Sequence, residues 1–152
     1  LQDKKRISST RIRKALSQGD VKTANVLLGH NYQLSGRIRH GDKRGRTIGF
    51  PTLNIKMPEK IALKYGVYAV KVHGLGDMPL NGVSNLGIRP TVNGQENRVE
   101  THVFDFNQDV YGKHINIEFV EFIRAENKFD SIDMLKQQIK IDAAKARVIL
   151  NK

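Results

Sequence analysis

The sequence predicts a mainly β domain, an antiparallel barrel or sandwich with helices at both ends. Between positions 32 and 124, short runs rich in β-branched and aromatic residues alternate with glycine-rich turns. On both sides of this region, apolar residues recur at the spacings that amphipathic helices require. The chain has 152 residues, of which 39% are hydrophobic, so it is long enough to bury one substantial core.

The N-terminal segment predicts two short helices. We expect Ser8 or Ser9 to cap the first helix, which should end near Gly19. Asp20 is expected to cap the second, because an aspartate oxygen can accept hydrogen bonds from the exposed N–H groups of a first turn. Gly29 is expected to end it, since glycine readily adopts the left-handed conformation found after a helix C-terminus.

The central region predicts several short strands with no helix between them. Glycines separate the candidate strands, and this spacing is typical of an antiparallel barrel or sandwich. The expected strands are Tyr32–Arg39, Gly66–His73, Leu80–Leu86, Arg98–Phe106 and His114–Arg124, with a further short strand around Asn54–Ile55.

The C-terminal segment predicts one longer helix, capped by Asp130 or Ser131. Its apolar residues recur every three or four positions, so that one face should pack against the barrel. The residues of this apolar stripe are Ile132, Leu135, Ile139, Ala143, Ala146 and Ile149.

The charge distribution indicates a polyanionic partner. The net charge is +11, and residues 1–46 contain 12 Lys/Arg against 3 Asp/Glu, whereas the other 106 residues contain 14 against 12. Nucleic acid, an anionic membrane or the phosphates of a nucleotide would each suit such an asymmetry. A basic helix and a basic loop exposed to solvent would produce the same pattern.

The composition excludes several kinds of site. The chain has no cysteine, which excludes disulfides, a thiolate nucleophile and a cysteine-ligated zinc ion. No apolar run approaches the roughly 20 residues of a membrane-spanning helix, and no signal peptide opens the sequence. The expected compartment is therefore the cytoplasm.

The segment HGDKRGRTIGFPTLN, residues 40–54, combines glycines, basic side chains and a proline. It lacks the Gly-Lys-Ser/Thr ending of a P-loop, yet glycine-rich backbone and cations can bind an anion. Pro51 stiffens its exit, and Thr52 and Asn54 project to the same side of an extended chain, where their neutral oxygens could hold Mg²⁺. The alternative is a hairpin turn in which Thr52 and Asn54 make local hydrogen bonds.

The segment VETHVFDFNQDVYG, residues 99–112, contains a candidate general base. Strand alternation places Glu100 on the same face as Phe104 and Phe106, where partial desolvation would suit proton abstraction. The alternative is that this face is solvated at the Glu100 end. His102 has no second histidine or carboxylate at zinc-site spacing, so we expect a structural role for it.

The segment RAENKFDS, residues 124–131, joins the last expected strand to the last helix. Arg124, Phe129 and a helix N-cap could together hold a planar aromatic ligand by stacking and hydrogen bonding. The alternative is that Phe129 is only the hydrophobic staple before the cap.

Together the three segments resemble riboflavin kinases, with matches spread from about Tyr32 to Arg147. The resemblance implies a six-stranded antiparallel Greek-key barrel with a C-terminal helix, here preceded by two short helices. It also implies transfer of the γ-phosphoryl group of ATP to the 5′-hydroxyl of riboflavin, which gives FMN and ADP. Riboflavin and ATP with Mg²⁺ would be the partners, with neither nucleic acid nor a membrane involved.

The segment ISSTRIR, residues 7–13, resembles the closing motif of the adenylyltransferase domain in bacterial bifunctional riboflavin kinase/FAD synthetases. The resemblance implies that residues 1–30 are the tail of a preceding adenylyltransferase domain and that residues 31–152 form the kinase domain. The His-x-Gly-His signature of that preceding domain is absent, so this chain alone is not expected to make FAD.

The resemblance also implies roles for individual residues. Glu100 would be the base that takes the hydroxyl proton, and Thr52 and Asn54 would hold Mg²⁺. Leu53 replaces the alanine usual in this motif, but its side chain should point away from the metal. The nucleotide-binding residues would be Gly41, Arg46, Thr52, Asn54, Val103, Asp105 and Tyr111, and the flavin-binding residues Arg124, Asn127 and Phe129.

The main alternative function is a basic β-barrel module that binds nucleic acid, with the basic first third as its electrostatic footprint. Its aromatic residues are scattered along the sequence, whereas single-strand binders place aromatic residues along one groove. A further alternative is an assembly or regulatory part of a larger enzyme.

Overall fold

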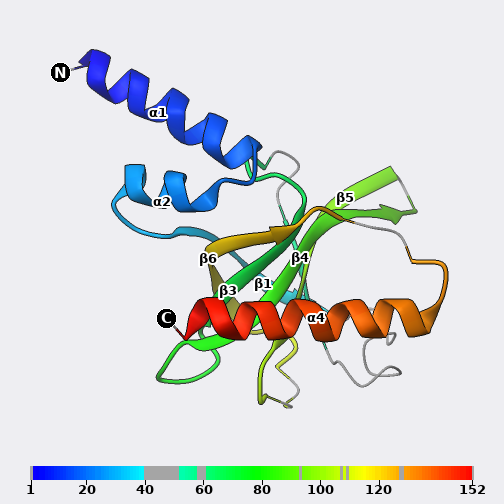
Figure 1. Ribbon diagram of the computed structural model, residues 1–152. Helices are drawn as coiled ribbons and strands as arrows, with labels where there is room; N and C mark the ends of the chain where they lie inside the picture. Colours follow the sequence, from blue (N-terminus) through cyan, green and yellow to red (C-terminus); the bar gives the residue numbers. More distant parts are fainter. Residues whose placement is uncertain are drawn as a thin grey trace.

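The protein is a closed antiparallel barrel with helices at one end and along one side (Figure 1). The structure, a computed structural model, describes residues 2–39, 52–57, 61–92, 94–106, 108, 110–126 and 129–151. Six strands close in the order β1-β2-β5-β4-β3-β6, and β6 pairs with β1. The strands are β1 (Tyr32–Arg39), β2 (Leu53–Lys56), β3 (Gly66–His73), β4 (Leu80–Thr91), β5 (Gly94–Val103) and β6 (His114–Arg124).

The structure confirms the six-stranded barrel, but three predicted strand ends are wrong: the end of β4 and both ends of β5, which begins at Gly94 and not at Arg98. β4 continues five residues beyond the predicted end to Thr91 and pairs with β5 as far as Gly94. The prediction that the next strand continues to Phe106 is wrong, because β5 ends at Val103. Asp105 has a φ of 57°, a left-handed conformation that a regular strand does not allow.

The barrel interior is apolar, because alternate residues of each strand point inward. Ile55 of β2, Val99 of β5 and Leu86 of β4 pair in register and are fully buried in the main core. Tyr68 and Phe119 add an edge-to-face aromatic contact with ring centroids 5.3 Å apart. The residues between these inward positions therefore face outward, and the candidate functional residues are among them.

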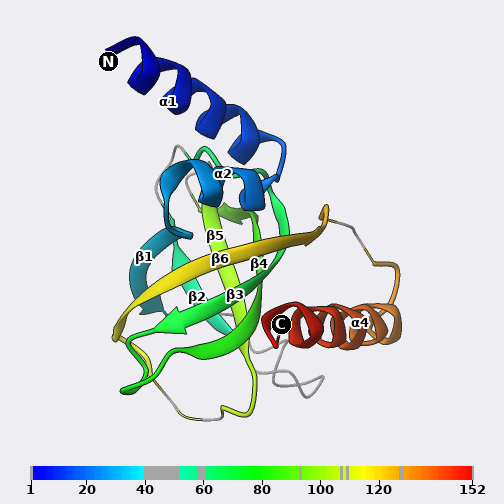
Figure 2. The ribbon, with the colours of Figure 1, turned by 60° about the vertical axis from the view of Figure 1, so that its left-hand side comes forward.

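Helix α2 (Val21–Leu28) and the C-terminal end of helix α1 (Gln2–Ser17) pack against one end of the barrel. The two helices lie together above β6 (Figure 2). Leu16, Val21 and Ala24 belong to the main core cluster, so this N-terminal segment packs on the barrel.

The caps of the N-terminal helices follow the predictions for α2 but not for α1. Asp20 accepts a hydrogen bond from the N–H of Thr23, and Gly29 has a φ of 80° at the end of α2. The prediction that Ser8 or Ser9 caps α1 is wrong, because the helix already begins at Gln2. The preceding Gln, Lys and Arg residues have good helix propensity, which favours this extension.

Helix α4 (Ile132–Leu150) packs along the outer face of β3 and β4 (Figure 1). Ser131 caps it by accepting a hydrogen bond from the N–H of Met134, as one of the two predicted caps. Ala146 is fully buried in a second apolar cluster beneath the helix. The predicted stripe fails only in the first turn, where Ile132 is 52% exposed.

Candidate functional site

The outer face of β2, β5 and β4 carries a row of polar side chains. Asn54 of β2 pairs in register with Glu100 of β5, and Glu100 pairs in turn with Asn85 of β4. Directly paired residues on adjacent antiparallel strands lie side by side on the same face. The structure therefore brings together Asn54 and Glu100, two of the residues predicted from separate segments.

Thr52 lies at the entry to this row. It immediately precedes β2 and is half-buried, while Asn54 is buried. Between them Leu53 packs against the barrel core, as predicted, so the extended chain turns its two polar neighbours outward. A hydroxyl and an amide oxygen beside a carboxylate fit Mg²⁺, which prefers hard oxygen ligands and keeps several positions for phosphates or water.

No group of three or more His, Cys, Asp or Glu residues suited to a metal ion occurs in the part of the chain that the structure describes. A Mg²⁺ ion at Thr52 and Asn54 would take further ligands from the phosphates of a bound nucleotide.

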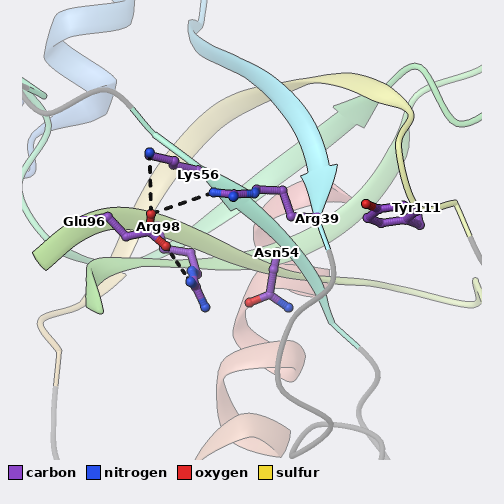
Figure 3. Close-up of a pocket in the computed structure, with 6 residues that line it drawn as sticks. All are labelled: Arg39, Asn54, Lys56, Glu96, Arg98 and Tyr111. Carbon is purple, nitrogen blue, oxygen red and sulfur yellow. Dashed lines mark hydrogen bonds and ion pairs between the residues drawn. The ribbon is translucent and has the colours of Figure 1, made fainter. Parts of the chain in front are cut away.

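A cationic pocket adjoins Asn54 (Figure 3). Its volume is about 230 Å³. Glu96 accepts a hydrogen bond from Arg98 at 2.5 Å and forms looser ion pairs with Arg39 and Lys56, each at 3.8 Å. The pocket is lined by Arg39, Asn54, Lys56, Glu96, Arg98 and Tyr111.

The electrostatics of this pocket favour an anionic ligand. The hydrogen bond from Arg98, followed by the nearby charges of Arg98, Lys56 and Arg39, lowers the pKa of Glu96 below its usual range. Glu96 is therefore ionised at neutral pH, and among the described residues that line the pocket it is one carboxylate beside three cations. The surplus positive charge beside Asn54 suits a phosphate group.

The predicted nucleotide-binding residues do not all lie together. Tyr111 lines the cationic pocket and is 56% exposed. Val103 is buried in the barrel core, whereas Asp105 lies 3.6 Å from Arg147 of α4 in an exposed ion pair. Gly41 and Arg46 lie outside the described residues. Of the three described positions, Tyr111 is the one that lines a pocket together with Asn54.

Two predicted flavin-binding residues, Arg124 and Phe129, lie close together at the start of the connection to α4. The guanidinium carbon of Arg124 is 5.6 Å from the Phe129 ring centroid. The same guanidinium donates from Nε and Nη2 to the buried carboxylate of Asp142, at 2.9–3.1 Å. Arg124 thus joins β6 to α4, and Asn127 lies outside the described residues.

The sequence reasoning did not single out Asn85, nor the pocket cations. Arg39, Lys56 and Arg98 belong to three strands, and only the pairing of β1, β2 and β5 brings them around Glu96. The alternation of residues 98–106 could have placed Arg98 on the face of Glu100. Nothing local in the sequence indicates that Asn85 lies opposite Glu100.

The helices give no indication of a membrane-spanning segment. Among the described residues, none of them is both long enough and apolar enough to cross a bilayer.

Comparisons with known proteins point to one family. The family model described as riboflavin kinase matches residues 28–150. Three relatives are named bifunctional riboflavin kinase/FMN adenylyltransferase. The relative from Haemophilus influenzae is 48% identical, and the match covers 98% of this chain and 48% of the relative. The relative from Escherichia coli K12 is 49% identical, with 93% of this chain and 45% of the relative covered. The relative from Bacillus subtilis is 50% identical, with 95% of this chain and 46% of the relative covered. The chain thus spans about half the length of the curated relatives it matches.

Solved structures share the fold. A chain described as a macrolide-efflux protein from Streptococcus pneumoniae is 40% identical, with a TM-score of 0.83 over 91% of this chain and 46% of that one. A riboflavin kinase from Trypanosoma brucei is 25% identical, with a TM-score of 0.55 over 79% and 80%. The efflux description differs from the names of the other relatives, but the family match covers most of this chain and includes both Asn54 and Glu100. The chain belongs to the riboflavin kinase family.

Proposed function

We propose that this chain transfers the γ-phosphoryl group of ATP to the 5′-hydroxyl of riboflavin, which gives FMN and ADP. The observation that carries this proposal is the pairing of Asn54 with Glu100, because it sets a candidate metal ligand beside a candidate base in a protein of this family. Phosphoryl transfer needs mainly positioning and charge neutralisation, and this site offers both.

In this proposal Glu100 accepts the proton of the attacking hydroxyl through its carboxylate. Thr52 and Asn54 offer neutral oxygens to Mg²⁺, which would neutralise phosphate charge and orient the γ-phosphoryl group when bound with ATP. Arg39 and Lys56, held only loosely by Glu96, supply further positive charge beside Asn54. Tyr111 lines the pocket in which we place the nucleotide.

The remaining predicted contacts belong to the proposal as well. Gly41, Arg46, Val103 and Asp105 are proposed for the nucleotide side on the family resemblance. Arg124, Asn127 and Phe129 are proposed for the flavin side, supported by the contact between Arg124 and Phe129.

The test is to incubate the purified chain with riboflavin, ATP and Mg²⁺ and to measure FMN and ADP by chromatography. We expect both products in equal amounts, since one phosphoryl group is transferred per turnover. Failure to form FMN across a pH series and with other divalent cations would reject the kinase function of this chain.

The chain covers less than half of the length of the named bifunctional relatives. We propose that residues 1–30 are the end of an adenylyltransferase domain and that residues 31–152 are the kinase domain. FAD is not expected from this chain alone, and a cytoplasmic location stays a prediction. The family match gives no support to the nucleic-acid-binding alternative.

Thr52→Ala and Asn54→Ala are each expected to raise the Mg²⁺ concentration needed for half-maximal activity, by about tenfold. Each variant removes one neutral oxygen that we assign to the ion. We take the loss to be similar to that of a hydrogen bond to a charged group, which contributes about 1.5–3 kcal/mol. Activity is measured over a Mg²⁺ titration at saturating ATP and riboflavin.

The matched control for this titration is Asn116→Ala. Asn116 hydrogen-bonds with Ser35 between β6 and β1, outside the row that contains Asn54. The Asn116→Ala variant should need the same Mg²⁺ concentration for half-maximal activity as the wild type. Equal Mg²⁺ curves for the Thr52, Asn54 and control variants would contradict the metal assignment.

A further inference from the structure

Asn85 of β4 has a buried acceptor that none of the described residues satisfies. Among the described residues, its Oδ1 is the one buried side-chain oxygen or nitrogen without a hydrogen-bond partner. Buried polar atoms are nearly always paired, because leaving one unpaired costs its lost hydration. An unpaired buried acceptor therefore calls for an explanation, such as a water molecule, an ion or a ligand that pairs with it.

The position of Asn85 relates this acceptor to the proposed reaction. Asn85 and Asn54 flank Glu100 from opposite sides in the cross-strand row. Neighbouring strands are about 4.8 Å apart, so the two asparagines are separated by about 10 Å with the carboxylate between them. In an in-line phosphoryl transfer, the attacking alcohol and the leaving phosphates lie on opposite sides of the transferred phosphorus. With the metal and phosphates near Asn54, the alcohol would lie on the Asn85 side of Glu100.

A second contact places the flavin segment near the same acceptor. Gly87 lies two residues beyond Asn85 on the same outer face of β4. A Cβ atom added to Gly87 would lie 2.0 Å from Oε1 of Glu126, so the Glu126 side chain rests directly on this strand. Glu126 belongs to residues 124–131, which are proposed to bind the flavin. Asn85 thus lies between the proposed base and the proposed flavin segment.

We propose that Oδ1 of Asn85 accepts a hydrogen bond from a hydroxyl of the ribityl chain and thereby positions the alcohol beside Glu100. The inference rests on the proposed function. The 5′-hydroxyl gives its one proton to Glu100, so the donor to Asn85 is a neighbouring hydroxyl of the same polyol. Oδ1 is shielded from solvent. Because the χ2 torsion of asparagine is soft, a turn about it would bring Oδ1 to a bound ribityl chain.

The test compares two flavins on Asn85→Leu, which keeps the branched shape of the side chain but removes the acceptor. Riboflavin carries the ribityl hydroxyls, whereas lumiflavin has a methyl group in their place. We expect the affinity for riboflavin to fall about tenfold and the KM for riboflavin to rise about tenfold, because one hydrogen bond is lost. Lumiflavin affinity and the KM for ATP should stay within about twofold of the wild type. The thermal midpoint should not fall, since Leu relieves an unpaired buried polar atom.

The matched control is Asn81→Leu, four residues earlier on the same face of β4. It should leave both flavin affinities unchanged. Should Asn85→Leu fail to fold, Asn85→Ala answers the same question with a smaller side chain.

Two results would overturn the inference. Equal weakening of riboflavin and lumiflavin would show that Asn85 acts on the ring or on the fold. Unchanged riboflavin affinity would show that no hydroxyl contacts the amide. Both results come from binding measurements, so they can be interpreted even if the chain makes no FMN. Absence of FMN would instead count against the proposed function.

Discussion

Glu100→Gln is expected to lower the turnover number for FMN formation by about 10²-fold or more, while riboflavin and ADP still bind. Glutamine keeps the size and the hydrogen-bonding capacity of the side chain, but it cannot take a proton. Because the loss occurs in the chemical step, kcat should fall much more than the KM values change. Steady-state kinetics and calorimetric titration with riboflavin and ADP measure the two effects separately.

The matched control for this experiment is Glu121→Gln. Glu121 lies on β6 and pairs with Lys22 of α2 at 2.8 Å, in a partly exposed ion pair. Exposed pairs contribute little to stability, and this one has no proposed part in the reaction. Its kcat should match the wild type. If Glu100→Gln retained full turnover, Glu100 would no longer be the base.

Asp142→Ala is expected to lower the free energy of unfolding by about 3 kcal/mol. Asp142 is only 2% exposed and receives hydrogen bonds from both Arg124 and Gln138. Its removal leaves the guanidinium of Arg124 without its carboxylate in a largely buried position, which is why the cost is large. Denaturant unfolding followed by circular dichroism measures this free energy.

Two further variants separate stability from flavin binding at this site. Asp133→Ala, in the exposed first turn of α4, should cost less than about 1 kcal/mol. The double variant Arg124→Met/Asp142→Leu replaces the ion pair with apolar side chains and should recover most of the lost stability. If Arg124 also binds flavin, the double variant should be stable yet bind riboflavin weakly. A double variant as unstable as Asp142→Ala would contradict this account of the pair.

The strand pattern of the barrel was predictable because it is local. β1, β3 and β6 have the predicted ends, since alternating residues and glycine turns mark them in the sequence itself. Asp20, Gly29 and Ser131 act at their helix ends as predicted, because a cap depends on its immediate neighbours.

The errors in the predicted strand ends arose where distant segments decide local structure. β4 runs on to Thr91 because β5 supplies pairing partners from Gly82 to Thr91. β5 stops at Val103, where Asp105 adopts its left-handed turn and pairs with Arg147 of the distant helix α4.

The sequence by itself determined the ends of β1, β3 and β6, the caps of α2 and α4, and the residue types available for phosphoryl transfer, since each follows from periodicity or a short motif. Only the tertiary structure decided which of these residues are neighbours. Glu100 lies between Asn54 and Asn85 because of the register of β2, β5 and β4. Strand pairing also places three cationic side chains around Glu96. Register depends on contacts between segments far apart in the chain, and shifting it by one residue would turn every one of these side chains to the other face.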